Sequence, residues 1–378
     1  MRAVKTTFSL LLLLLSGAPV AAESLRVYVG TYTTGGGGSR GIYRLRLDLA
    51  TGALLPDGEP TAAVDPSFLA LSPDGTRLFA VNETGQSRAD APGGVSAFAV
   101  TPSGGLMLLN TQPSGGAAPC HLTLDREGRH VLVANYWGGS VATFPVVGMD
   151  GHLGAASGIA QHEGRNPTPR DPGPHAHSVV LDAAGRFAVV SDLGLDKLFV
   201  YRFDAKSGSL AENPAALSLP AGAGPRRFAF HPDGRHGYSI NELDSSVTAF
   251  AWDAASGGLR PLQTVSTLPA GFAGANSTAE VAVSPDGKFL YGSNRGHDSI
   301  AIFAIDATTG ALTAAGHQPT RGRHPRHFAI DPTGAYLLAA NRDSDNVAVF
   351  RIDRRTGGLA PVGEPVRVPR AVCVLMRR

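Results

Sequence analysis

The chain of 378 residues is poor in cysteine, in charge and in long apolar runs, and each shortage excludes a class of protein. The formal net charge is only +2, which gives no reason to expect nucleic acid as a partner. No shift in composition and no charged linker divides the chain. We therefore expect one large domain rather than several.

The longest apolar stretch, residues 8–15, is too short to span a bilayer, which needs about 20 residues. Arg2 and Lys5 precede it, and small residues follow at positions 20–22. This order is typical of a secretory signal peptide. We predict that residues 1–22 are cleaved, that residues 23–378 form the mature domain, and that the protein is exported, to a periplasm, without a membrane anchor.

What the chain has in abundance is glycine, with 47 residues, and much of it marks a repeat. A four-residue turn ending in Gly recurs six times at intervals of 47 to 57 residues, and short strand-like runs rich in Val and Phe flank each copy. The turns lie at residues 72–75, 125–128, 182–185, 231–234, 284–287 and 331–334. This pattern predicts β-hairpins within a repeat architecture.

A second repeated element, Gly-x-Leu, occurs seven times rather than six, ending at Leu54, Leu106, Leu153, Leu210, Leu259, Leu312 and Leu359. The missing turn is explained if residues 369–372 begin a seventh unit and residues 26–32 supply its second strand. Joining the two ends leaves no sheet edge unpaired. The sequence thus predicts an all-β fold, a seven-bladed β-propeller of four-stranded antiparallel blades closed by its own N- and C-terminal strands.

The two cysteines, Cys120 and Cys373, fall in the second and the closing blade of this scheme. A disulfide needs Cα atoms within about 7 Å, whereas these blades are two or more steps apart around the ring. We favour two buried free thiols over a disulfide.

The reactive side chains gather at two offsets from the turn glycines. Residues eight before and eight after each Gly lie at one end of the paired strands. The first set is Ser67, Cys120, His177, Arg226, Ala279 and Arg326, and the second is Glu83, Tyr136, Leu193, Glu242, Arg295 and Arg342. Four of these, His177, Arg226, Glu242 and Arg295, fall on three consecutive blades. We predict that they meet at one mouth of the ring as a polar pocket.

Further candidates for contact with a substrate are Tyr136, Arg342, His175, Asp192, His121 and Glu280. His121 and Glu280, with Arg227 and His327, stand seven residues before their turn glycines, so strand alternation is expected to turn them to the other side. Three insertions, residues 33–40, 86–92 and 162–174, should overhang the pocket and shape its rim.

Less specific readings of the same residues remain open. Arg226 and Glu242 face each other across one hairpin and could be an ordinary cross-strand ion pair. His175 and His177 could ligate a metal, but no third ligand stands at a supporting distance, so we expect no metal and no cofactor.

In order and spacing the motifs resemble the seven-bladed propeller lactonases, which include bacterial 6-phosphogluconolactonase and fungal carboxy-muconate cyclases. The resemblance covers nearly the whole mature chain. It is carried by residues 28–33, 120–122, 133–136, 174–179, 191–194, 241–243, 293–300 and 341–346.

The resemblance implies a lactonase that opens a sugar-acid lactone. We expect this activity to be metal-independent, with an anionic small molecule as substrate and a monomeric chain. It assigns the family's active-site His, two Arg and Glu to His177, Arg226, Arg295 and Glu242. Two departures, Arg227 in place of a frequent His and Arg342 in place of a frequent Gln, imply a difference in substrate charge.

Three alternatives stay open at this point. The first is a lactonising cyclase of the carboxy-muconate type, and the second is an exported scaffold without catalysis. The third is a six-bladed calcium-dependent lactonase, which the seven Gly-x-Leu elements and the arginine-rich column argue against. The resemblance also leaves open whether His177 or Glu242 is the general base.

Overall fold

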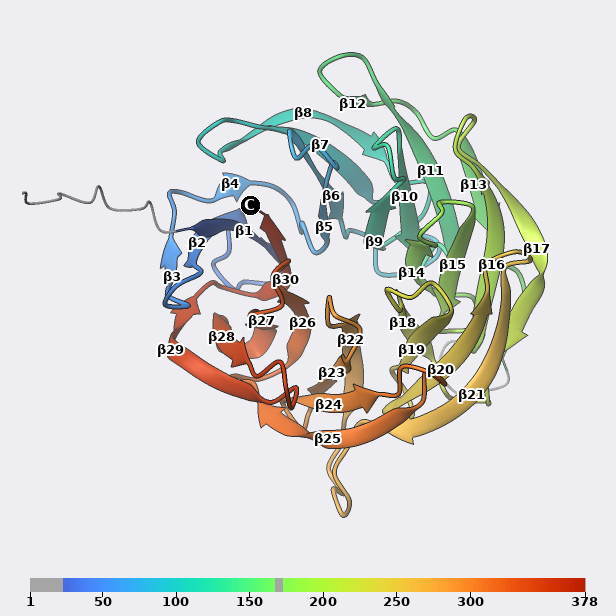
Figure 1. Cartoon of the computed structure of the whole chain (residues 1–378). Coiled ribbons are helices and arrows are strands. Elements are labelled where there is room, and N and C mark those ends of the chain that lie inside the picture. Colours follow the sequence, from blue (N-terminus) through green and yellow to red (C-terminus); the bar gives the residue numbers. More distant parts are fainter. Residues whose placement is uncertain (1–22, 167–172, 378) are drawn as a thin grey trace, which may run out of the picture.

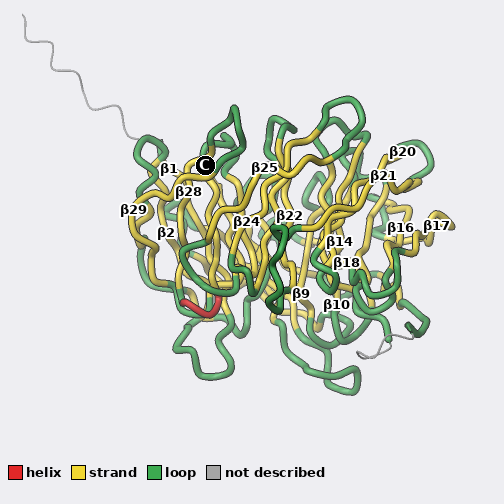
Figure 2. The backbone as a smooth tube through the Cα atoms, turned by 90° about the horizontal axis from the view of Figure 1, so that it is seen from below, coloured by secondary structure: helices red, strands yellow, loops and turns green. Residues whose placement is uncertain are grey.

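The computed structural model describes residues 23–166 and 173–377, and their regular secondary structure consists almost wholly of β-strands. Figure 1 shows the strands as sheets arranged around a central axis, and Figure 2 shows the same ring edge-on. Within the described residues the one helical element is the 3-10 turn η1 (Arg342–Ser344), and no helix is long and apolar enough to cross a membrane. The predicted signal peptide, residues 1–22, lies outside the described residues.

Seven antiparallel sheets form the blades, as predicted, and consecutive strands build the first six. The first three blades contain β5 (Leu69–Leu71), β6 (Arg77–Asn82), β7 (Gly94–Val100) and β8 (Leu106–Pro113); β9 (Pro119–Leu124), β10 (His130–Asn135), β11 (Ser140–Val147), β12 (His152–Leu153) and β13 (Gly158–Gln161); and β14 (Ala176–Leu181), β15 (Phe187–Asp192), β16 (Lys197–Asp204) and β17 (Ser209–Ser218).

The next three blades repeat the same hairpin connections. They contain β18 (Pro225–Phe230), β19 (His236–Asn241), β20 (Ser246–Asp253) and β21 (Gly258–Ser266); β22 (Ser277–Val283), β23 (Phe289–Arg295), β24 (Ser299–Ile305) and β25 (Leu312–Pro319); and β26 (Pro325–Ile330), β27 (Tyr336–Asn341), β28 (Asn346–Ile352) and β29 (Leu359–Arg367). In each blade the first strand lies nearest the central axis (Figure 1).

The seventh blade unites the two ends of the chain. β1 (Ser24–Thr31) pairs with β2 (Gly41–Asp48) on one side and with the last strand, β30 (Ala371–Arg377), on the other. The short strands β3 (Leu54–Pro56) and β4 (Thr61–Ala62) complete the sheet against β2. The two ends of the chain thus share one sheet, which confirms the predicted closure.

The repeated turns close the inner hairpin of each of the first six blades. Gly75 has φ of 63° and its N–H donates to the carbonyl of Ser72 at 2.8 Å, and Gly287 has φ of 74° with the same bond to Ser284. A residue with a Cβ is strained at such φ values, so glycine is the residue that fits. The Gly repeat in the sequence is therefore a repeat of backbone conformation.

Apolar faces of neighbouring blades pack against each other and form the core. Phe79 of blade one packs with Val131 and Phe144 of blade two, and all three are fully buried. Burying a side chain of this size contributes about 1.5–3 kcal/mol. Cys120 and Cys373 are both buried and form no disulfide, as predicted.

Ring closure predicts a sharp sensitivity at the seam. Val374 on β30 lies opposite Val29 on β1 and is 2 % exposed. The substitution Val374→Asp buries an unpaired carboxylate, so we expect a loss of at least about 3 kcal/mol in the free energy of unfolding. Arg367→Asp, on the exposed end of β29, is the control and should stay within about 0.5 kcal/mol of the unsubstituted chain. Equal thermal unfolding curves for both variants would contradict a seam at β1 and β30.

Candidate active site

A β-bulge in the innermost strand positions the site. In β14, β18 and β26 the pairing register slips by one residue, and the extra residue is His177, Arg226 and Arg326, respectively. Cys120 occupies the same position in β9. A bulge bends its strand and redirects a side chain. Four of the six residues that stand eight before the turn glycines are therefore bulge residues, and they lie at one end of the central channel.

Glu242 is held between two arginines from neighbouring blades. Arg226 Nε and Arg295 Nη2 each lie 2.8 Å from Glu242 Oε2. The remaining guanidinium contacts run to backbone carbonyls, from Arg226 to Ala279 at 2.8 Å and from Arg295 to Thr278 at 2.6 Å. Arg226 and Glu242 thus form the cross-strand pair, but the pair is part of a buried three-residue cluster shared by blades four and five.

The cluster fixes the charge of its members. Burial alone would raise the pKa of Glu242, but Arg295 and Arg226 outweigh it and hold that pKa below its usual value. Burial lowers the pKa of Arg295 to about 10, although Glu242 opposes the shift. Near neutral pH the carboxylate is consequently ionised and Arg295 still carries its proton.

His177 is an uncharged imidazole beside this cluster. Burial, followed by the positive charge of Arg226 and Arg326, holds the pKa of His177 well below its ordinary range. Its Nδ1 lies 3.6 Å from Cys120 Sγ, and the thiol donates to the carbonyl of His177 at 3.4 Å. Burial raises the pKa of Cys120 to about 12, so it remains a thiol. The sulfur is then free to accept Nδ1–H, which leaves the lone pair of His177 on Nε2.

Arg326 and Glu83 form a second acid–base pair that the sequence reasoning did not select. Arg326 Nη2 lies 3.5 Å from Glu83 Oε1, and the guanidinium stands over the ring of Tyr32 at 5.3 Å. Tyr32 Oη donates to Glu83 at 2.9 Å, and Ser67 Oγ also donates to that carboxylate. The sequence did contain a signal for this pair, because Arg326 and Ser67 stand eight residues before a turn glycine and Glu83 stands eight residues after one.

These groups surround a pocket of about 480 Å³ at the mouth of the channel. It is lined by Tyr32, Thr34, Gly35, Asp65, Glu83, Gly85, Gln86, Ala118, Cys120, Tyr136, Trp137, His177, Glu242, Arg295, Arg326 and Arg370. Thr34 and Gln86 come from the insertions 33–40 and 86–92, so both loops do border the pocket. Arg226 lies directly behind Glu242 and is 1 % exposed.

Two arginine nitrogens in this pocket lack partners. Arg295 Nε and Arg370 Nε are buried without a hydrogen-bond partner among the described residues, and both side chains line the pocket. Leaving a buried donor unpaired costs about 1–3 kcal/mol. Arg326 also lines the pocket, so three guanidinium groups make it suited to an oxygen-rich or anionic molecule.

The expected orientation of the residues at offset minus seven was wrong, and the bulge is the reason. Arg227 from blade four stands 4.3 Å over the ring of Phe68 from blade one, and Arg227 Nε lies 3.3 Å from Glu280 Oε2. His121 stacks near Phe68 at 4.3 Å between ring centroids, and His327 reaches Glu280 at 3.5 Å. These side chains meet across the channel as a separate buried layer.

Five predicted contact residues, His121, Glu280, Asp192, His175 and Arg342, are absent from the pocket lining. His121 and Glu280 belong to the buried layer. Asp192 accepts a hydrogen bond from the backbone N–H of His175 at 2.8 Å and lies 2.6 Å from His162 Nδ1, so it organises its own loop. His175 stacks on Tyr136, and Arg342 pairs with Asp343 at 2.6 Å. Residues 167–172 of the third insertion lie outside the described residues.

Comparison with known proteins places these features in a family. A family model described as lactonase, seven-bladed β-propeller, matches residues 26–376. A 6-phosphogluconolactonase from Bacillus subtilis (strain 168) is 38 % identical over 305 residues, or 80 % of this chain and 83 % of the relative. A 6-phosphogluconolactonase from Formosa agariphila is 36 % identical over 313 residues, or 80 % and 85 % of the two chains.

A solved structure extends the likeness to the backbone. A periplasmic gluconolactonase from Pseudomonas aeruginosa superposes with a TM-score of 0.87 at 34 % identity, covering 94 % of this chain and 99 % of that chain.

The contacts of Glu242 with Arg226 and Arg295, here called the arginine clamp, predict that Glu242 is needed for stability. Glu242→Ala leaves Arg226 and Arg295 without their shared buried counter-ion, so we expect a loss of about 3–5 kcal/mol in the free energy of unfolding. Glu364→Ala is the control, because Glu364 pairs with Arg321 while 88 % exposed and its removal should have almost no effect. Chemical unfolding measures both, and an E242A variant as stable as E364A would refute the buried clamp.

Proposed function

The chain belongs to the lactonase family of seven-bladed β-propellers, and from that premise we propose that it hydrolyses a sugar-acid lactone in the manner of a 6-phosphogluconolactonase. The observation that carries the proposal is one pocket lined by an uncharged imidazole, His177, and by a protonated guanidinium, Arg295. Opening of an ester ring by water requires a proton acceptor and a donor for the developing oxyanion.

His177 is the proposed general base. Its Nε2 takes a proton from water as the water oxygen attacks the lactone carbonyl carbon and forms a tetrahedral oxyanion. Collapse of this intermediate breaks the bond between the carbonyl carbon and the ring oxygen, and His177 returns its proton to that oxygen. The products balance as one hydroxy acid from one lactone and one water.

Arg295 is the proposed oxyanion donor. Its Nη2 is engaged by Glu242 and Thr278, while Nε is buried and lacks a partner among the described residues. A carbonyl oxygen placed against the guanidinium where it lines the pocket would gain a charge-assisted hydrogen bond as negative charge develops on it. Since this donor stabilises the oxyanion, the proposed reaction is metal-independent.

Glu242 is proposed to position the arginines rather than to take the proton. Both guanidinium contacts fall on one carboxylate oxygen, and they lower the basicity of the group. Its ionised state keeps Arg226 and Arg295 side by side despite their like charge. On this proposal His177, rather than Glu242, is the general base.

Arg326 and Arg370 are proposed to bind an anionic substituent of the lactone. Both line the pocket, and Arg370 Nε is buried and unpaired among the described residues. Guanidinium groups match the geometry of a phosphate or carboxylate. Glu83 sets the position of Arg326 through their contact of 3.5 Å.

We also propose export to the periplasm and action as a monomer. The proposal of export rests on the signal-like residues 1–22, and the Pseudomonas aeruginosa relative is named as a periplasmic protein. An exported enzyme would meet lactones outside the cytoplasm, so its substrate can differ from that of a cytoplasmic relative.

The proposed activity is tested with a panel of sugar-acid lactones, phosphorylated and unphosphorylated, assayed with and without a chelator. We expect turnover of at least one lactone that chelation does not change. Arg295→Lys should stay folded and lose about 10²–10³-fold in kcat/KM, because a lysine ammonium does not reproduce the planar set of donors of a guanidinium.

The matched control for that variant is Arg321→Lys, which alters an arginine that pairs with the highly exposed Glu364. Failure of every lactone to react would reject the lactonase proposal. Loss of turnover in chelator would reject the metal-independent chemistry, and unchanged kinetics of R295K would remove Arg295 from the site.

The low pKa values of His177 and Glu242 predict an unusual pH profile. Activity requires the basic form of His177, and a lowered pKa keeps that form populated at lower pH. The value of kcat/KM should therefore stay level from pH about 8 down past about 6.5, the ordinary pKa of histidine, and fall only in more acidic solution. Initial rates corrected for spontaneous hydrolysis measure it. An acidic limb centred at or above the ordinary value would contradict the buried, uncharged imidazole.

A further inference from the structure

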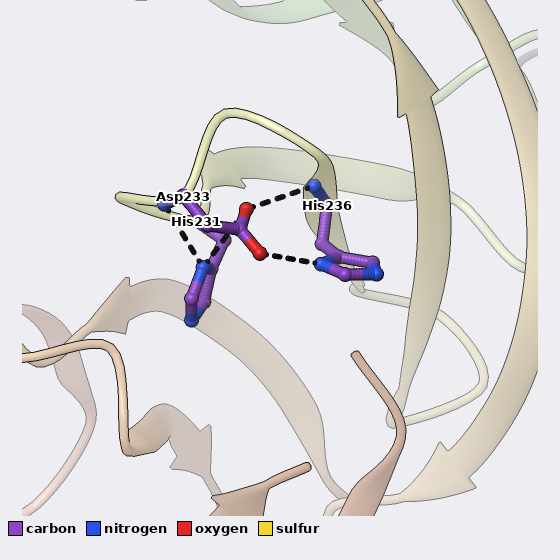
Figure 3. Close-up of side chains that lie close together, drawn as sticks. All are labelled: His231, Asp233 and His236. Atoms are coloured by element: carbon purple, nitrogen blue, oxygen red, sulfur yellow. Dashed lines mark hydrogen bonds and ion pairs between the residues drawn. The ribbon is translucent and has the colours of Figure 1, made fainter. Parts of the chain in front are cut away.

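A second cluster of ligating side chains lies at the opposite end of blade four from the pocket. The turn between β18 and β19 carries His231 and Asp233, and His236 opens β19. One ligand atom from each residue lies within 4.8 Å of the other two. Figure 3 shows the Asp233 carboxylate between the two imidazole rings, with contacts of 3.0 Å to His231 Nδ1 and 2.8 Å to His236 Nδ1.

The other repeats show what this turn requires and what is additional. In blades one and five a serine opens the turn, and its hydroxyl donates to the aspartate two residues later, from Ser72 to Asp74 at 2.5 Å and from Ser284 to Asp286 at 2.7 Å. Asp233 fills the place of these aspartates. His231 replaces the serine, although a serine satisfies the turn, and His236 adds a second imidazole where blade five has a phenylalanine.

The hydrogen bonding of His231 prepares its Nδ1 as a ligand. Its Nε2 lies 2.8 Å from the carbonyl oxygen of Gly287 in blade five, which can only accept, so Nε2 carries the hydrogen. The lone pair is then on Nδ1, which faces the Asp233 carboxylate as well as the Asp233 N–H at 3.1 Å. The facing Asp233 Oδ1 in turn accepts the backbone N–H of Arg235 at 2.7 Å, and a cation between Nδ1 and Oδ1 would relieve the repulsion of their lone pairs. A carbonyl that holds the other ring nitrogen is also the usual support of a metal-bound histidine.

We propose that His231, Asp233 and His236 bind one Zn²⁺ ion through two Nδ1 atoms and one carboxylate oxygen, with water completing the coordination. Two imidazoles and a carboxylate are a donor set that Zn²⁺ accepts, at about 2.0–2.2 Å. Ligands of a tetrahedral ion are about 3.3 Å apart at such lengths. The present contacts of 3.0 and 2.8 Å run to the two different oxygens of Asp233, so binding of one ion requires the three side chains to shift around it.

The exposure of the three side chains suits a bound ion. The side chains of His231 and His236 are each 9 % exposed, which limits competition from water, whereas Asp233 is 17 % exposed and leaves an entry path.

Metal binding would fasten two blades together. His231 links the turn of blade four to Gly287 in the turn of blade five, and His236 packs against Gly310, where a Cβ would lie 2.3 Å from the ring. An ion holding both rings would restrain these contacts on the face opposite the pocket. The site is therefore a stabilising one, separate from the lactonase chemistry.

The test is calorimetric titration of the tag-free, chelator-treated chain with Zn²⁺. We expect one-to-one binding and a rise of about 2–5 °C in the apparent melting temperature at saturation. His231→Ser and His236→Phe should each weaken binding at least about tenfold. Both substitutions install residues that other turns of this chain carry at the same place, so the fold should persist.

His152→Ala is the matched control, because His152 pairs with Asp150 at 3.0 Å as an exposed pair and should not affect binding. Absence of binding, or binding that H231S and H236F leave unchanged, would overturn the proposal and leave a shared proton as the cation of the cluster. Lactone turnover is measured on the same samples, and its presence or absence bears only on the proposed function.

Discussion

The innermost strand of the blades carries the constraint on which the site depends. A regular strand would send alternate side chains to opposite faces of its sheet. The single extra residue in β9, β14, β18 and β26 breaks that alternation next to the channel. Because four blades repeat the bulge at one height, Cys120, His177, Arg226 and Arg326 meet around a common axis although more than two hundred residues separate the first from the last.

Burying this many charges is tolerable because carboxylates offset part of the positive charge. Glu242 neutralises two guanidiniums that would otherwise repel, and Glu83 balances Arg326 on another part of the wall. The same positive surroundings keep His177 uncharged. The pocket combines an ionised acid, an uncharged base and unpaired donors, and this separation of roles follows from packing and charge alone.

The sequence predicted the blade number, the closing strands and the offset column correctly, because turn glycines and strand periodicity are local signals. It predicted the direction of Arg227 and Glu280 wrongly, because a bulge is set by pairing between strands and leaves no mark in the alternation of one strand. Arg326 and Glu83 were visible in the offset columns, but their pairing joins blades at the two ends of the chain. The contacts of Asp192 with its own loop could not be inferred from spacing.

The seam between β1 and β30 has a topological consequence. Arg26 lies opposite Arg377, so the two ends of the folded chain are neighbours on adjacent antiparallel strands. A short linker could join them, and the chain could then be opened at an exposed connection between two other blades without altering any pairing. Circular order, rather than the position of the first residue, defines this architecture. The pairing of β1 with β30 forms only once synthesis has delivered β30.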